Sequence, residues 1–112
     1  MMIAHSLPDP YFGDAQNLHG ATYVVDAEFI SKKLNSHNVV VDIGHASDLL
    51  KATLKQLNYQ NLDQYKEFSG QLTTTEFLAR HIHDQLRKAI DHAIQIKITL
   101  HESHIASASY SE

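Results

Sequence analysis

The stretch that decides the fold is Leu18-His19-Gly20-Ala21-Thr22-Tyr23-Val24-Val25-Asp26-Ala27-Glu28-Phe29-Ile30. It is rich in β-branched and aromatic residues. From Tyr23 to Ile30, one apolar set of side chains alternates with a second set that contains Asp26 and Glu28. Alternation with a period of two is typical of a β-strand with one buried face. The stretch therefore predicts one long strand, with His19 at its beginning.

The segments on either side of this strand are shorter. Residues Met2 to Leu7 predict a short apolar strand, and a loop with Pro8-Asp9-Pro10 and Gly13-Asp14 separates it from the long one. Prolines fix φ and remove hydrogen-bond donors, so this loop cannot continue either strand. After the long strand, residues 32–38 read as a polar turn. Val39-Val40-Val41 reads as a short buried strand or an extended segment.

Two helices are predicted in the middle of the chain. The first begins between Ile43 and Ala46 and ends near Leu57, with leucines at three-to-four spacing. A polar loop, Asn58 to Gly70, follows it. The second helix opens at Thr73-Thr74-Thr75-Glu76, where a threonine followed three residues later by glutamate fits a capping box. Its predicted apolar face consists of Phe77, Leu78, His81, Ile82, Leu86, Ala89 and Ile90.

The last part of the chain predicts two more strands, Ile94 to Leu100 and Ile105 to Tyr110. Either a bulge near Glu102 to His104 or a tight hairpin can join them. The order ββααββ predicts an α+β fold, an antiparallel four-stranded sheet with two helices on one face. Such a sheet has exposed edges, and the joining of sheets from several subunits would cover them. A homo-oligomer is therefore expected.

Length and composition narrow the possible functions. A chain of 112 residues, 43% of them apolar, is a single domain (1–112) with enough material for a small core. No apolar run approaches the ~20 residues that span a bilayer, and the first residues lack the basic region of a signal peptide. We therefore expect a cytoplasmic protein that does not contact membranes. The chain has no cysteine, which excludes disulfides and thiolate ligands, and its net charge of −4 with no basic cluster argues against nucleic acid.

Nine histidines are the unusual feature of the composition. His5 and His19 lie at opposite ends of the first loop, so antiparallel pairing of the two predicted strands would bring their imidazoles together. Two interpretations stay open at this point. In the first, the two histidines belong to a metal site, although a catalytic zinc usually has three protein ligands and a water. In the second, they are ordinary hydrogen-bonded or surface histidines. Solvated surface positions are predicted for His37, His45, His83, His92 and His101.

Six short motifs, in order along the chain, have counterparts in one known family. They are Ile3-Ala4-His5-Ser6-Leu7, Leu18-His19-Gly20-Ala21-Thr22-Tyr23, Val40-Val41-Asp42-Ile43, Leu57-Asn58-Tyr59-Gln60-Asn61-Leu62-Asp63, Thr73-Thr74-Thr75-Glu76 and Thr99-Leu100-His101-Glu102-Ser103. The chain thereby resembles the 6-pyruvoyltetrahydropterin synthase and 6-carboxytetrahydropterin synthase family. The resemblance implies the tunnelling fold, in which trimers build a barrel of strands, two trimers stack into a hexamer, and pterin sites lie between subunits.

The resemblance also implies roles for particular residues. His5 and His19 fall on positions that ligate Zn²⁺ in the family, and Glu102 falls on the glutamate that anchors the pterin. A carboxylate accepts two N–H bonds from the aminopyrimidine edge of a pterin, while Thr74 or Thr75 at the helix start would meet its carbonyl. Without the resemblance, Glu102 reads as a surface strand residue and the threonines as a plain helix cap.

The departures from the family pattern concern its chemistry. The third zinc ligand falls on Ala21, the catalytic cysteine is missing near Ala15 or Gln16, and the family's Asp-His pair falls on Asn58 and Tyr59. A third metal ligand would have to come from His104, a carboxylate or water. Tyr59 and His104 are the candidate catalytic residues that the resemblance leaves.

Three functions are consistent with this pattern. The first is a divergent lyase that acts on a reduced pterin triphosphate by metal-assisted proton transfer and elimination. The second is a non-catalytic oligomer that binds a pterin or purine. The third is a structural oligomer without a small ligand. General acid–base catalysis supplies a factor of ~10²–10⁴, so a chain that has lost the family's acid and base should turn over the usual substrate poorly.

Overall fold

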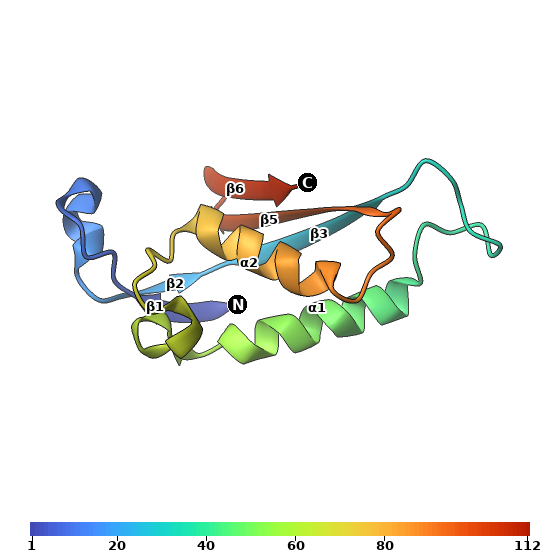
Figure 1. Cartoon of the computed structure of the whole chain (residues 1–112). Helices are drawn as coiled ribbons and strands as arrows, with labels where there is room; N and C mark the ends of the chain where they lie inside the picture. Colours follow the sequence, from blue (N-terminus) through green and yellow to red (C-terminus); the bar gives the residue numbers. More distant parts are fainter.

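The computed structural model describes all 112 residues, and the long predicted strand runs along much of its length (Figure 1). This strand is present as β2 (His19–Thr22) and β3 (Val24–Ile30). Along β3 the predicted alternation is observed, because every second residue is exposed and the others are half-buried. The interruption falls at Tyr23, whose backbone N–H donates to the Met1 carbonyl at 2.7 Å and whose carbonyl accepts from the Met1 amino group at 2.9 Å.

The strands form two sheets of three. β1 (Met2–His5) pairs antiparallel with β2 and parallel with the two-residue β4 (Gln60–Asn61). In the second sheet, β5 (Gln95–Ser103) lies between β3 and β6 (Ala106–Ser111), antiparallel to both. The four predicted antiparallel strands are thus present, but they do not form a single four-stranded sheet. The division arises because the long strand pairs with β1 before Tyr23 and with β5 after it.

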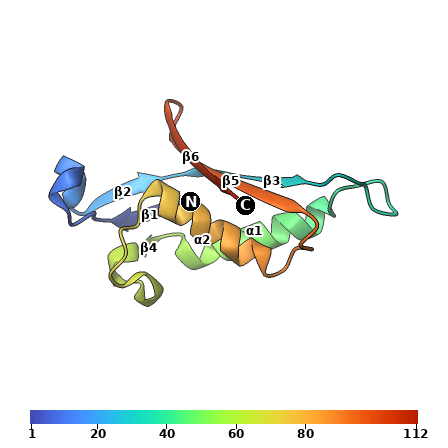
Figure 2. The ribbon, with the colours of Figure 1, turned by 45° about the horizontal axis from the view of Figure 1, so that its top comes forward.

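Two α-helices, α1 (Ile43–Leu57) and α2 (Thr75–Arg87), cover the same face of the strands (Figure 2). The side chain of Asp42 caps α1 by accepting from the Gly44 N–H at 2.9 Å. The α+β class and the placement of both helices on one face are confirmed. Fully buried side chains from α1, α2 and β5 form the centre of the core: Leu57, Leu78, Ile82, Leu86, Ile96, Ile98 and Leu100.

Several local expectations differ from the structure. Thr74, not Thr73, is the N-cap of α2, because its hydroxyl accepts from the Phe77 N–H at 3.1 Å. Residues 39–41 form no strand. The loop after α1 contains β4 and two 3₁₀ turns, and a third 3₁₀ segment, Pro10–Gln16, lies in the first loop. A bulge and a tight hairpin were the two predicted connections between β5 and β6, and the structure contains both. The chain makes a tight turn, and the strand register shifts between His101 and Ser103.

The prediction that His83 is solvated was wrong. Its side chain is buried on α2, its ring packs against Tyr110 at 4.7 Å between centroids, and it pairs with Asp84 and Glu112. Burial tends to raise the pKa of Glu112, but the hydrogen bond from His83 and the charge of Arg87 outweigh it and hold this pKa below its ordinary value. His83 is buried because β6 folds back onto α2, a contact that the helix pattern alone does not contain.

The molecule is elongated, with extents of 51 × 27 × 21 Å. Its radius of gyration is 15.3 Å, whereas a compact chain of this length would have about 13 Å. The first loop and the loop before α1 lie at opposite ends (Figure 1). Large apolar side chains remain exposed, among them Tyr11, Leu18, Val24, Ile43 and Ile105. Neither α-helix has the length and apolar character needed to cross a membrane.

Candidate functional site

The pairing of β1 with β2 brings His5 and His19 together as predicted. They are directly opposite in the register, and their ring centroids are 4.7 Å apart. His5 is only 3% exposed, and its Nδ1 lies 3.0 Å from the hydroxyl oxygen of Thr73. The His19 Nδ1 lies 2.8 Å from the Asn17 carbonyl oxygen. Because a carbonyl only accepts, His19 donates from Nδ1, so its neutral form carries the lone pair on Nε2.

The surroundings of His5 favour its neutral form. Burial lowers the pKa of His5 and the neighbouring His19 lowers it further, while the Thr73 bond and the carboxylates of Asp63 and Glu102 act in the opposite direction. The net shift is downward. Asp63 itself is held by Ser6, whose backbone N–H and hydroxyl donate to its two carboxylate oxygens at 3.0 and 2.6 Å. At neutral pH, the His5 ring is therefore uncharged and keeps the lone pair of one nitrogen.

Glu102, on β5, lies near Tyr23, and both are near the start of α2. The β3–β5 register pairs Val24 with His101, so one further step along both strands brings Tyr23 beside Glu102. Tyr23 is 2% exposed, and no hydrogen bond of normal geometry satisfies its hydroxyl, although the Thr75 side chain lies near it. Burial raises the pKa of Tyr23, the nearby Thr75 hydroxyl opposes this rise, and Glu102 adds to it. Glu102 is exposed, and its charge acts on the buried hydroxyl of Tyr23.

Other predicted site residues are not brought to this place. His104 lies in the exposed turn after β5. Tyr59 is 78% exposed at the end of α1, with a φ of 62°, and its backbone N–H donates to the Met2 carbonyl at 2.7 Å. Thr74 is occupied as the cap of α2, which leaves Thr75 as the threonine near Tyr23. The chain contains no group of three or more histidine, aspartate or glutamate side chains arranged to hold a metal ion.

Comparison with known proteins decides the family. A family model described as 6-pyruvoyl tetrahydropterin synthase matches residues 1–112. The chain belongs to the 6-pyruvoyl tetrahydropterin synthase family. Among solved structures, the 6-pyruvoyl tetrahydropterin synthase of Caenorhabditis elegans is similar with a TM-score of 0.87 at 20% identity, over 100% of this chain and 89% of that chain. This likeness confirms the tunnelling fold. A search of curated proteins found no match.

In this member of the 6-pyruvoyl tetrahydropterin synthase family, the histidine pair lacks a third donor side chain. His5 and His19 have the features of zinc-ligating histidines, because in each ring one nitrogen is held by a polar partner and the other is free. A third ligand on the same strand face would stand at Ala21, which pairs with Ile3, and neither side chain has a donor atom. The donor set therefore does not fit a three-ligand catalytic zinc site.

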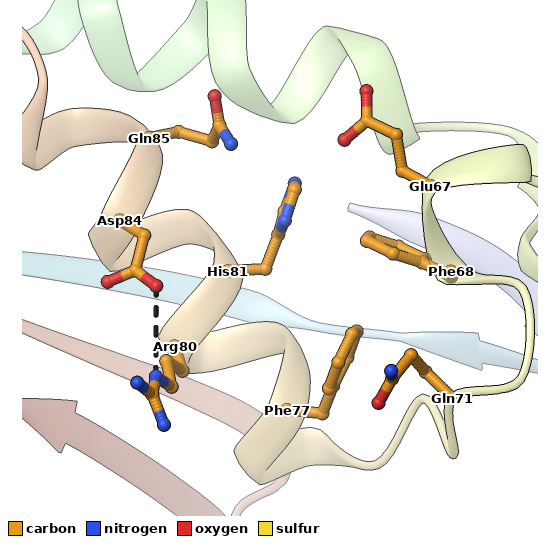
Figure 3. A pocket seen from close by; sticks show the side chains of 8 residues that line it. All are labelled: Glu67, Phe68, Gln71, Phe77, Arg80, His81, Asp84 and Gln85. Atoms are coloured by element: carbon orange, nitrogen blue, oxygen red, sulfur yellow. Dashed lines mark ion pairs between the residues drawn. The ribbon is translucent and has the colours of Figure 1, made fainter.

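Two cavities lie near α2 in this pterin synthase family member. One of about 570 Å³ adjoins the histidine pair, with Ser6, Asp9, Asp63 and Thr73 in its lining. The other, of about 420 Å³, surrounds His81 on the outer side of α2 (Figure 3). His81 packs edge-on against Phe68 at 4.8 Å between centroids, and burial lowers its pKa. Neither His5 nor His19 lines the first cavity, but its lining residues Ser6 and Thr73 are the chain neighbour and the hydrogen-bond partner of His5, so this cavity is the nearer of the two to the histidine pair.

Sequence reasoning missed three residues of this family member's site. Thr73 was predicted as the helix cap but holds His5. Asp63 lies exposed in the loop after α1, and sequence reasoning did not predict that it accepts from Ser6. Tyr23 was assigned only to a buried strand face. One signal for Tyr23 was available, since a tyrosine on the buried face of an alternating strand needs a partner for its hydroxyl. No comparable signal marked Thr73, whose partner is 68 residues away.

Proposed function

We propose that this chain binds a reduced pterin at the place where Glu102, Tyr23, the start of α2 and the His5–His19 pair lie near one another. One observation carries the proposal: the exposed Glu102 carboxylate acts electrostatically on the buried Tyr23 hydroxyl, which no hydrogen bond of normal geometry satisfies. The aminopyrimidine edge of a pterin presents two N–H donors, which match the two oxygens of a carboxylate. An unsatisfied buried hydroxyl costs roughly 1–3 kcal/mol, and a ring with a carbonyl or ring nitrogen in reach would remove that cost.

Turnover of the pterin is the second candidate function, and the histidine pair favours it. A neutral, buried His5 next to a His19 with a free Nε2 can take a proton from one pterin atom and return it to another. The family resemblance implies a zinc-assisted elimination from a pterin triphosphate, with His104, a carboxylate or water as the third ligand. Because one chain supplies two imidazoles and no third donor, binding is the function that the geometry supports best.

Binding is tested by calorimetric titration with 7,8-dihydroneopterin. Replacing Glu102 with glutamine keeps its shape but removes the charge, so affinity should fall about 10- to 30-fold, the equivalent of one charge-assisted hydrogen bond. Glu28→Gln is the matched control, because Glu28 is exposed on the opposite face of β3 and should leave affinity unchanged. A protein that takes up no pterin at millimolar concentration, or a Glu102→Gln variant that binds normally, would refute the proposal.

We further propose that the chain assembles as a homo-oligomer, a trimer or hexamer with the sites between subunits. The accessible surface is 7347 Å², whereas a compact monomer of this mass would expose about 6,200 Å². Exposed apolar residues and the free edge of β6 also support assembly. Light scattering after size exclusion should give three or six times the chain mass of 12.6 kDa. The mass of a single chain, independent of concentration, would contradict assembly.

A further inference from the structure

The cavity around His81 has no part in the proposed pterin site. It measures about 420 Å³ and lies between α2 and the turn Lys66–Phe68 (Figure 3). Neither Tyr23 nor Glu102 is in its lining. It shares Phe68 and Gln71 with the cavity beside His5, whereas Glu67 and His81 line this cavity alone. A function of its own therefore has to be argued from Glu67, His81 and their neighbours.

Aromatic rings form a fixed wall of this cavity. Phe68 projects from the turn Lys66–Phe68 towards His81 and Phe77 on α2 (Figure 3). Its ring meets the His81 ring at 88° and 4.8 Å between centroids, and the Phe77 ring at 88° and 5.1 Å. Phe68 is only 4% exposed, so close packing holds the three rings in place. Such rings attract cations and flat groups that stack on them.

His81 adds a neutral hydrogen-bonding group to the wall. Burial lowers the pKa of His81 and outweighs the carboxylates of Glu67 and Asp84, which act in the opposite direction, while Lys88 lowers this pKa further. At neutral pH the ring is therefore uncharged, and one of its nitrogens is an acceptor. No hydrogen bond contributes to the shift, because the ring packs against Phe68 and has no polar partner in the chain.

The remaining polar groups of the lining are rich in acceptors. Glu67 and Gln85 lie on either side of the His81 ring (Figure 3). The ion pair in the lining joins Arg80 to Asp84 at 3.7 Å and leaves the Glu67 carboxylate open. With His81 uncharged, two carboxylates against one guanidinium leave one net negative charge around the cavity.

We infer that this cavity binds a small planar organic cation, a compound that carries a guanidinium or amidinium group. Such a group donates N–H bonds in a fork that matches a carboxylate, here that of Glu67, and it has no acceptor of its own. Its flat face stacks on aromatic rings, and its charge balances the net negative charge of the lining. The cavity volume of about 420 Å³ lies within the range of about 300–1,000 Å³ that is usual for small-molecule sites. The inference does not depend on the proposed pterin site.

The test compares three probes of equal chain length on the assembled protein, namely butylguanidinium, butylurea and butylammonium, at low millimolar concentration by calorimetry. Butylurea has the same shape without the charge, so it should bind at least about 10-fold more weakly than butylguanidinium, because hydrogen bonds to charged groups are the stronger ones. Butylammonium has the charge without the flat fork and should bind about 3-fold more weakly or worse. The ring signals of ¹³C-labelled His81, identified by their absence from His81→Gln, should shift with butylguanidinium.

Variants of the lining locate the binding. Glu67→Gln keeps the shape and removes the charge, so butylguanidinium should bind about 5- to 10-fold more weakly. Phe77→Leu keeps an apolar side chain without a π face and should cost about 2- to 5-fold in affinity. Glu28→Gln, at an exposed position of β3, is the matched control for Glu67→Gln and should change nothing.

Each contrary outcome overturns the inference. If butylguanidinium binds no more tightly than butylurea or butylammonium, the cavity does not recognise a planar cation. Normal binding by Glu67→Gln, or an unchanged His81 signal, would place the probe elsewhere on the molecule. A fall in the mass of the assembly when the probe is added would show that a neighbouring copy, and not a small molecule, occupies the cavity. None of these results bears on pterin binding, which is measured with its own ligand.

Discussion

Replacing Ala21 with histidine is expected to convert the chain into a stoichiometric zinc protein. Ala21 lies two residues after His19 on β2, so both side chains point to the same face of the strand. Ala21 pairs with Ile3, so His5, two residues after Ile3, is its diagonal neighbour on the adjacent strand. Diagonal neighbours of this kind are about 7–8 Å apart. Imidazoles at such positions can all reach one zinc at ~2.0–2.1 Å. Zinc affinity should rise at least about 100-fold, because mutation of residues that only hydrogen-bond to metal ligands already changes metal affinity about 10- to 100-fold.

Elemental analysis and competition with a zinc chelator measure this change. Thr22→His is the matched control, because Thr22 is the next residue and its side chain is on the exposed face. Combining Ala21→His with His19→Ala should abolish the gain, as only two imidazoles remain. Near-stoichiometric zinc in the unmodified protein, lost in His5→Ala, would contradict the interpretation that Ala21 leaves the site incomplete.

Replacing Ile98 with alanine should destabilise the fold by about 3–4 kcal/mol, in the range measured for large-to-alanine changes in cores. Ile98 is 0% exposed and lies in the middle of β5, opposite Ala27 on β3 and Tyr110 on β6. Its removal leaves a cavity where both sheet neighbours and α2 meet. Because only 19 of 112 residues are buried, other core contacts have little capacity to compensate.

Denaturant unfolding at one fixed protein concentration measures the loss, since assembly also contributes to stability. Lys97→Ala is the control on the opposite face of the same strand, and its cost should remain below about 1 kcal/mol. A cost for Ile98→Ala as small as that of the control would mean that β5 is not at the centre of the core.

The features that sequence reasoning predicted correctly depend on local patterns. The alternation from Tyr23 to Ile30 and the leucine spacing up to Leu57 reflect which side of an element faces the core, and both are confirmed. The division into two sheets was not predictable in this way. Which strand pairs with each part of a long strand depends on residues far away in the chain, here β1 and β5.

The candidate site shows the same limit. The pairing of His5 with His19 followed from two predicted strands joined by one loop, and the structure confirms it. Among three consecutive threonines, however, any one can cap a helix. The choice of Thr74 depends on Thr73 being held by His5, a contact between distant parts of the chain. Glu102 was identified through family resemblance alone, since an exposed glutamate near the end of a strand has no distinguishing local pattern.

The position of Tyr23 has a mechanical consequence. Its backbone is hydrogen-bonded to Met1, which precedes the central strand β1 of one sheet, and it directly precedes the first residue of β3 in the other sheet. Tyr23 thus joins the two sheets. Its ring is buried in the core, and its hydroxyl makes no hydrogen bond of normal geometry. A molecule bound to this hydroxyl would contact the residue at which the two sheets join, and we expect its binding to limit movement of one sheet relative to the other.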